Sequence, residues 1–228
     1  MLIGGLQKFS LIDYPGKISA IIFTQGCNFR CPYCHNPELV EPVLFQRAMS
    51  SKKIFSFLEK RKGKIDAVVV TGGEPTLQKD LLNFIRKIKN MGYLVKLDTN
   101  GSNPNIIENM IDKKLVDYIA MDIKAPLQKY EEIVRAEIDT KKIEKSINLI
   151  MESGIDYEFR TTLIKSLLST EDVLNIGKTI QGAKRYILQK FIPSKTLDRE
   201  FLTSTFSTDD FKFLYKKLGS YIVECIIR

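Results

Sequence analysis

Three cysteines lie within eight residues near the start of the chain: Cys27, Cys31 and Cys34. Thiolates at this Cys-x3-Cys-x2-Cys spacing can each bind one iron of a cubane iron-sulfur cluster. Such a cluster normally takes four thiolates, so three thiolates leave one iron open to another ligand. The spacing therefore predicts a 4Fe-4S cluster with a free coordination position.

Two other functions of these thiols stay open. A structural zinc ion needs four ligands, and the candidates for the fourth are His35 and Cys225. His35 follows Cys34 directly, so the two side chains diverge, and Cys225 lies far along the chain. The other function is a simple electron carrier or metal-binding module. A disulfide is disfavoured because three clustered thiols pair badly.

Composition predicts one soluble globular unit. Of the 228 residues, 44% are hydrophobic and 10% aromatic, which is enough for a sizeable core. We expect a single domain over residues 1–228, with its core at about 17–192 and a C-terminal extension. No basic leader and no long apolar run occurs, which favours a cytoplasmic protein without membrane contact. The net charge of +8 comes from scattered lysines, which argues against a nucleic-acid partner.

Short apolar runs rich in β-branched residues alternate with helical patterns along the chain. The runs predict buried strands at 18–24, 67–71, 93–99, 118–123, 157–163 and 186–191. Helices are predicted at 51–61, 80–91, 105–113, 140–153 and 170–181, followed by a last helix at 208–218 and a short strand at 221–227. This alternation predicts an α/β fold with a parallel sheet covered by helices.

Polar residues follow nearly every predicted strand. In parallel α/β folds the site forms at the carboxyl ends of the strands, where residues distant in sequence meet. Besides the cysteines, the candidates at these ends are Gly72, Gly73, Glu74, Asp98, Thr99, Asp122, Lys124 and Arg160. Each alone has an ordinary explanation as a turn, a tight strand exit or an ion pair. Their joint position behind three cysteines favours a functional site.

Together these motifs resemble the radical S-adenosylmethionine (SAM) enzymes, specifically the glycyl-radical-enzyme activating proteins. That group includes the activators of anaerobic ribonucleoside-triphosphate reductase and of pyruvate formate-lyase. The matching segments span roughly residues 2–200 and are Phe23-Thr24-Gln25-Gly26-Cys27, Cys34-His35-Asn36-Pro37, Thr71-Gly72-Gly73-Glu74-Pro75, Leu97-Asp98-Thr99-Asn100-Gly101 and Met121-Asp122-Ile123-Lys124. The resemblance implies a partial (β/α)6 barrel of the TIM type.

The resemblance also implies an activity and a set of partners. SAM would bind the open iron and be cleaved reductively to methionine and a 5′-deoxyadenosyl radical. That radical would take the Cα hydrogen of a glycine in a partner enzyme, most simply an anaerobic ribonucleotide reductase or a related glycyl radical enzyme. The chain has no further cysteine sets for auxiliary clusters, so an external donor such as flavodoxin or ferredoxin would supply the electron.

Roles for the strand-end residues follow from the same resemblance. The segment 72–74 would hold the methionine amino group, because glycines permit close backbone approach. Asp98 would lie near the ribose, or bind a monovalent cation together with Thr99 and Asp122. Lys124 and Arg160 would address the carboxylate or ribose of the cofactor.

One region departs from the family pattern. Some relatives carry a histidine near the last barrel strand, where this chain has Gln189-Lys190-Phe191-Ile192-Pro193-Ser194-Lys195. The only histidine is His35, which we expect to form hydrogen bonds near the cysteine ligands.

An alternative substrate is a small molecule. The 7-carboxy-7-deazaguanine synthases share the three-cysteine and glycine-rich motifs on a compact barrel. The segment Cys34-His35-Asn36-Pro37 and the upstream turn Asp13-Tyr14-Pro15-Gly16 favour a protein substrate instead.

Overall fold

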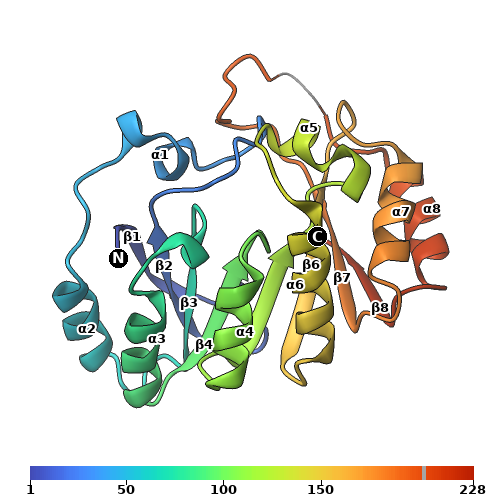
Figure 1. Ribbon diagram of the computed structural model, residues 1–228. Helices are drawn as coiled ribbons and strands as arrows, with labels where there is room; N and C mark the ends of the chain where they lie inside the picture. The colour runs from blue at the N-terminus through green and yellow to red at the C-terminus, as the bar shows by residue number, and fades with distance from the viewer. Residues whose placement is uncertain (202–203) are drawn as a thin grey trace.

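The structure, a computed structural model, describes residues 1–201 and 204–228. Its centre is a curved sheet whose strands lie side by side in chain order (Figure 1). The first strand runs antiparallel to the second, and all later neighbours are parallel. The strands are β1 (Ile3–Ser10), β2 (Ser19–Thr24), β3 (Ala67–Gly72), β4 (Leu94–Thr99), β5 (Tyr118–Asp122), β6 (Asp156–Leu163), β7 (Arg185–Lys190) and β8 (Glu224–Ile227).

The longer helices cover the outer face of the sheet (Figure 1). They are α2 (Ser51–Glu59), α3 (Leu81–Asn90), α4 (Pro104–Asp112), α6 (Thr140–Glu152), α7 (Thr170–Thr179) and α8 (Thr208–Leu218). Shorter elements lie near the carboxyl ends of the strands or follow them: α1 (Pro37–Val40), α5 (Tyr130–Val134), and the 3-10 turns η1 (Pro42–Leu44), η2 (Pro75–Leu77) and η3 (Leu127–Lys129). No helix in the two described ranges is long and apolar enough to cross a bilayer.

Alternation of side chains along the strands gives the sheet two different faces. Outward residues such as Val68 and Val70 pack with the helices in the main core. Inward residues such as Val69 and Tyr118 belong to a smaller cluster. Tyr14, in the β1–β2 loop, closes this inner cluster with its ring centroid 5.7 Å from that of Tyr118. Tyr14 therefore covers only part of the amino-terminal end of the barrel, where a hollow of about 480 Å³ remains beside it and Tyr118.

The predicted α/β fold with a parallel, partly closed barrel is confirmed. The six predicted internal strands correspond to β2–β7, and the last helix and strand correspond to α8 and β8. β8 begins at Glu224, three residues later than expected. β1 was not expected, because its sequence mixes two glycines with polar residues. The assignment of residues 1–228 to a single domain stays a prediction.

Candidate functional site

A cavity of about 550 Å³ opens at the carboxyl ends of the parallel strands. It brings together ten of the eleven candidates drawn from the sequence: Cys27, Cys31, Cys34, Gly72, Gly73, Glu74, Asp98, Thr99, Asp122 and Lys124. The exception is Arg160, which does not line the cavity. Because the parallel strands all end at the same edge of the sheet, motifs that are far apart in the sequence lie together in one cavity.

All three cysteine sulfurs have hydrogen-bond donors in their surroundings. Cys27 Sγ accepts from the Phe29 N–H at 3.4 Å and lies 3.9 Å from the Asn100 side-chain amide. The Tyr33 hydroxyl donates toward Cys31, and the Asn36 backbone N–H donates toward Cys34. Burial raises the pKa of Cys27 to about 12 and that of Cys31 to about 11. The free thiols therefore hold their protons at neutral pH, and iron must displace those protons on binding.

The donor set fits a multi-iron cluster better than a single zinc ion. Among residues 1–201 and 204–228, no three His, Cys, Asp or Glu side chains are arranged to hold one metal ion. The three thiols line the same cavity, whereas Cys225 lies on β8 outside its lining. In a cubane cluster each thiolate binds a different iron, so the sulfurs need not converge on one point.

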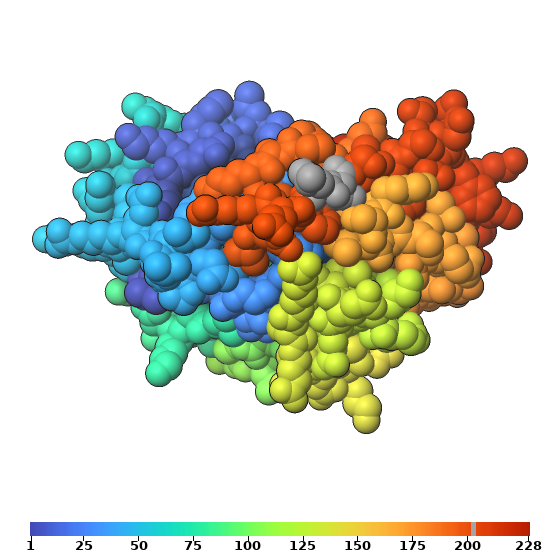
Figure 2. Space-filling model, turned by 90° about the horizontal axis from the view of Figure 1, so that it is seen from above, coloured from blue at the N-terminus to red at the C-terminus, as the bar shows by residue number. Residues whose placement is uncertain are grey.

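Residues 191–201, which we call the strap, cross above the cavity. Viewed from above, this orange segment lies across the top of the molecule, beside blue and light-blue atoms of the N-terminal part and close to the yellow-green region around α5 (Figure 2). The backbone N–H of Leu197 donates to the carbonyl of Cys34 at 2.9 Å, and that of Asp198 donates to Pro32 at 3.0 Å. The strap therefore supports the cysteine loop directly.

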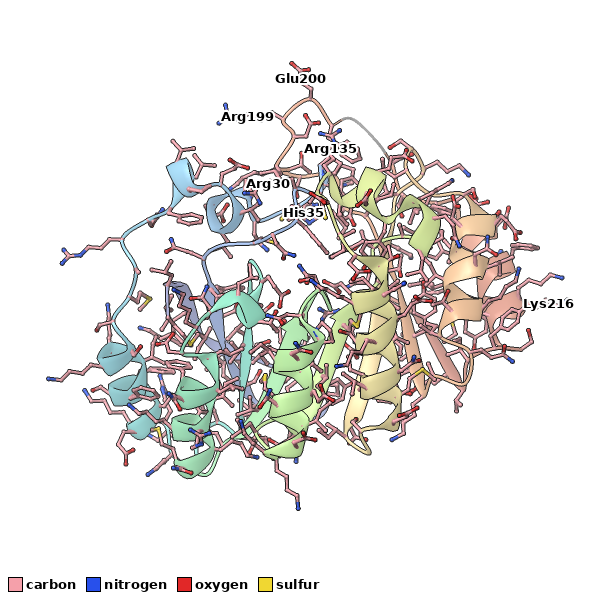
Figure 3. All side chains as sticks on the ribbon, viewed as in Figure 1. Arg30, His35, Arg135, Arg199, Glu200 and Lys216 are labelled. Atoms are coloured by element: carbon pink, nitrogen blue, oxygen red, sulfur yellow. The ribbon has the colours of Figure 1, made fainter. Side chains whose placement is uncertain are left out.

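Side chains fasten the strap at both margins. Lys195 pairs with Glu38 of α1 at 2.6 Å, and Asp198 pairs with Arg135 at 2.8 Å. His35 stacks on Phe191 of the strap, with ring centroids 5.3 Å apart, and hydrogen-bonds the Ile192 backbone. Burial lowers the pKa of His35. Figure 3 shows His35 and Arg135 beneath the segment that carries Arg199 and Glu200.

The glycine-rich turn after β3 packs against the cysteine loop through its backbone. Gly73 N–H donates to the Thr24 carbonyl and Glu74 N–H to the Gly26 carbonyl, both at 2.8 Å. A Cβ on Gly73 would lie 2.2 Å from the Gly26 oxygen. Gly72 has φ +122°, and a Cβ there would lie 2.3 Å from Thr24 N. Only glycine fits this approach.

The Glu74 carboxylate is fully buried and already bonded. One oxygen accepts from Thr76 N at 3.0 Å, Thr76 Oγ1 at 2.6 Å and Thr99 Oγ1 at 2.7 Å. The other accepts from Asn100 N at 2.7 Å. Burial raises the pKa of Glu74 despite these bonds. Glu74 therefore ties the exit of β3 to the exit of β4.

Behind the cavity wall, opposite charges alternate across three strands. Arg160 donates to Asp122 Oδ1 at 2.8 Å and to Asp98 Oδ2 at 3.2 Å. Lys124 pairs with the other Asp122 oxygen at 3.0 Å. Burial acts to raise the pKa of Asp122, but Arg160 and Lys124 outweigh it and hold that pKa well below its usual range. The geometry places Arg160 behind the two carboxylates, and its contact with the cofactor stays a prediction.

Several lining residues were not predicted. Asn100 was visible only as part of a turn motif, which is ordinary in loops. The end of β7 and the start of the strap contribute Gln189, Lys190, Ile192 and Ser194. Gln189, Lys190 and Ser194 contribute polar groups to the lining in this region. Their common signal was position at a strand end, since their residue types indicate no particular chemistry.

The family model described as "Radical SAM superfamily" matches residues 21–175. A protein of Methanocaldococcus jannaschii, provisionally named a glycyl-radical enzyme activating enzyme, is 38% identical over 100% of this chain and 95% of its own. The pyruvate formate-lyase-activating enzyme of Streptococcus mutans is 27% identical over 86% of this chain and 78% of its own.

A crystal structure of Streptococcus suis SuiB bound to S-adenosylmethionine has a similar fold, with a TM-score of 0.71 at 14% identity. The similarity covers 90% of this chain and 49% of SuiB, so the chain spans about half the length of that protein. The chain therefore belongs to the radical SAM superfamily, whose members use a 4Fe-4S cluster and S-adenosylmethionine, and within it to the glycyl-radical enzyme activating enzymes.

Proposed function

We propose that this protein uses SAM to generate a glycyl radical on a partner enzyme. The observation that carries the proposal is the single cavity that joins three thiols to the glycine-rich turn, Asp98 and Lys124. A 4Fe-4S cluster bound there would supply the electron that cleaves the sulfonium of SAM. The full-length similarity to a glycyl-radical enzyme activating enzyme supports a protein as the substrate.

The chain's own residues would bind the cluster and SAM, orient them and enclose them. Cys27, Cys31 and Cys34 would hold three irons and leave the fourth for SAM. Backbone groups of 72–74 would hold the methionine amino group. Lys124, whose pKa is raised well above its usual value chiefly by Asp122 against the effect of burial, stays charged and suits a carboxylate.

Asp98 would contact the ribose. A monovalent cation beside Asp98, Thr99 and Asp122 also stays part of the proposal. The Arg160 guanidinium already lies between the two carboxylates and would compete with such a cation. Binding of SAM should therefore depend weakly on the choice of sodium or potassium.

The partner would be an anaerobic ribonucleotide reductase or a related glycyl radical enzyme, present with this protein in the cytoplasm. A glycine on a mobile loop could reach the cavity from the side of the strap that carries Ile192, which lines the cavity and is 70% exposed. The reducing electron would come from an external donor such as flavodoxin or ferredoxin.

Anaerobic reconstitution tests the proposal. The protein should bind about four irons and four sulfides per chain, and replacement of any of the three cysteines with alanine should abolish that binding. Reduced protein with SAM should release 5′-deoxyadenosine and methionine. With the partner present, a glycyl radical signal should appear in its EPR spectrum. SAM cleavage without that signal on any glycyl radical enzyme, but with turnover of a deazapurine precursor, would support the small-molecule alternative.

A further inference from the structure

An oppositely charged pair lies inside the barrel, below the cavity. Lys96 of β4 is 2% exposed and Glu158 of β6 is 1% exposed. Both project inward, two residues before Asp98 and Arg160 on the same strands, so each shares a face with its neighbour. Neither residue follows from the motifs of the family, and neither lines the cavity.

The pair completes the charge alternation behind the cavity wall. Lys96 Nζ lies 2.9 Å from Asp98 Oδ1 and 3.9 Å from Glu158 Oε1. Glu158 Oε1 in turn lies 3.8 Å from Arg160 Nη1. The other Glu158 oxygen accepts a hydrogen bond from the Tyr118 hydroxyl at 3.0 Å. With this pair included, three cations balance three anions.

Register explains why the two head groups can meet. Asp98 pairs with Ala120 of β5, and Ala120 pairs with Glu158 of β6. The small Ala120 side chain therefore stands between two acidic positions and leaves room for the head groups of Lys96 and Arg160. A larger residue at this register would fill that space.

Asp98 depends on Lys96 more than the distances alone suggest. Asp98 Oδ1 is buried, and the group that approaches it in the described residues is the Lys96 ammonium at 2.9 Å. Lys96 is then the counter-charge of that oxygen, while Arg160 holds the other. Loss of one partner of a buried ion pair leaves an uncompensated charge, and the remaining group moves or takes up a proton.

We propose that Lys96 and Glu158 are positioning residues of the site. Lys96 holds the Asp98 carboxylate in the cavity wall, and Glu158 holds the cations that face Asp98 and Asp122. This inference rests on the proposed function, in which Asp98 contacts bound SAM. If the pair were purely structural, neutral replacements of Lys96 and Glu158 would change the stability of the protein. They would leave Asp98 and the rest of the cavity wall in place.

Binding of SAM to reconstituted protein, measured by equilibrium dialysis without reductant, separates the two roles. Lys96→Met should weaken SAM binding about tenfold or more, since a charged partner of Asp98 is lost. Asp98→Asn should weaken it as well. The double variant Lys96→Met/Asp98→Asn should bind no more weakly than the worse single variant, because both changes act on one contact.

A variant that removes one charge of each sign tests whether weaker SAM binding comes from misfolding. Lys96→Met/Glu158→Gln removes one charge of each sign, so the barrel interior stays neutral. It should unfold near the wild-type temperature yet still bind SAM about tenfold more weakly. Lys89→Met is the matched control, because Lys89 pairs with Asp117 at 2.6 Å away from the cavity; its SAM affinity should equal that of the wild type.

Three results would overturn the inference: wild-type SAM affinity in Lys96→Met, additive effects in the cycle with Asp98→Asn, or unfolding of both Lys96→Met and Lys96→Met/Glu158→Gln. Failure of the proposed function looks different. In that case the wild-type protein itself, loaded with its cluster, would not bind SAM.

Discussion

Asn100 connects the cysteine loop to the turn after β4. Its side-chain amide donates to Asn28 Oδ1 at 3.0 Å and lies 3.9 Å from Cys27 Sγ, while its backbone N–H donates to Glu74. Hydrogen bonds to cluster sulfurs stabilise the more negative, reduced state and so raise the reduction potential. A single amide could thus adjust how readily the cluster accepts an electron.

We expect Asn100→Ala to lower the reduction potential of the bound cluster, because a donor to the Cys27 sulfur is removed. Potentiometric titration followed by EPR measures the change. Asn109→Ala is the control, since Asn109 hydrogen-bonds only within the exposed surface of α4. An unchanged or raised potential in Asn100→Ala would show that this amide does not reach the cluster.

Glu74 leads to a prediction about stability. The two carboxylate oxygens of Glu74 accept four hydrogen bonds and donate none. In Glu74→Gln one of these oxygens becomes an NH2 group, which would face a backbone or hydroxyl donor instead of accepting from it. The free energy of unfolding should fall by about 1–3 kcal/mol. Urea denaturation measures this value, and the exposed Glu137→Gln should stay within about 0.5 kcal/mol of the wild type. Equal stability of the two variants would contradict the bonding described for Glu74.

At the scale of elements, the ends of β4, β5 and β6 share one set of charges. Asp98 and Asp122 belong to neighbouring strands, and Arg160 on the third strand holds both. Burial would raise the pKa of Asp98, but Arg160 and Lys96 together hold it below its usual value of 3.8. Strand pairing thus has an electrostatic component whose strength depends on pH.

The sign of that dependence follows from the lowered pKa values. Folding favours the ionised carboxylates, so their contribution to stability is present above about pH 4 and is lost as the pH falls toward their folded pKa values. We expect the urea midpoint of the wild type to fall more between about pH 7 and pH 3 than that of Asp122→Asn. The variant should be less stable at pH 7, because Arg160 and Lys124 lose a partner. Parallel curves for both proteins would contradict this.

The contact between the β3 exit and the cysteine loop can be tested through Gly73. In Gly73→Ala the added Cβ would meet the Gly26 carbonyl at 2.2 Å, so the loop must move. We expect loss of most bound iron after reconstitution, with a circular dichroism spectrum close to wild type. Gly5→Ala is the matched control, because its Cβ would find only an ordinary 3.5 Å contact with Phe23. Full iron loading of Gly73→Ala would show that the loop tolerates the shift.

Strands could be predicted from the sequence where the apolar pattern was clear. The runs that became β2, β3 and β5 are mostly apolar, as strands buried on both faces require, so their ends and the cysteine loop could be placed in one site. The partners of charged residues could not be derived in this way. Lys96 and Glu158 look like ordinary polar positions in a strand, and only register and curvature show that they meet inside the barrel.

At the scale of the whole molecule, the strap joins parts of the chain that are far apart in sequence. Its two backbone hydrogen bonds reach the cysteine loop, and its two ion pairs reach α1 and the residue after α5. Both ion pairs are largely exposed to solvent, and such pairs contribute little to stability. The strap can therefore open without unfolding the sheet.

We expect the double variant Arg135→Ala/Lys195→Ala to exchange the amide hydrogens of Leu197 and Asp198 about tenfold faster, while global stability falls by less than about 2 kcal/mol. Hydrogen exchange with mass spectrometry measures the first effect and urea denaturation the second. Lys62→Ala, which breaks an exposed pair with Glu59 far from the strap, should leave strap exchange unchanged. Unaltered exchange in the double variant would show that the backbone bonds alone hold the strap.

The strap also sets an order of events during synthesis. Cys34 leaves the ribosome long before Leu197, the residue that bonds to its carbonyl. At typical translation rates the interval lasts roughly 10 to 30 seconds. Throughout that time the cysteine loop has no cover, so iron and sulfide delivered to the nascent chain meet open thiols. In the finished chain the strap lies against this loop, so we expect iron and sulfide to load more slowly at that stage.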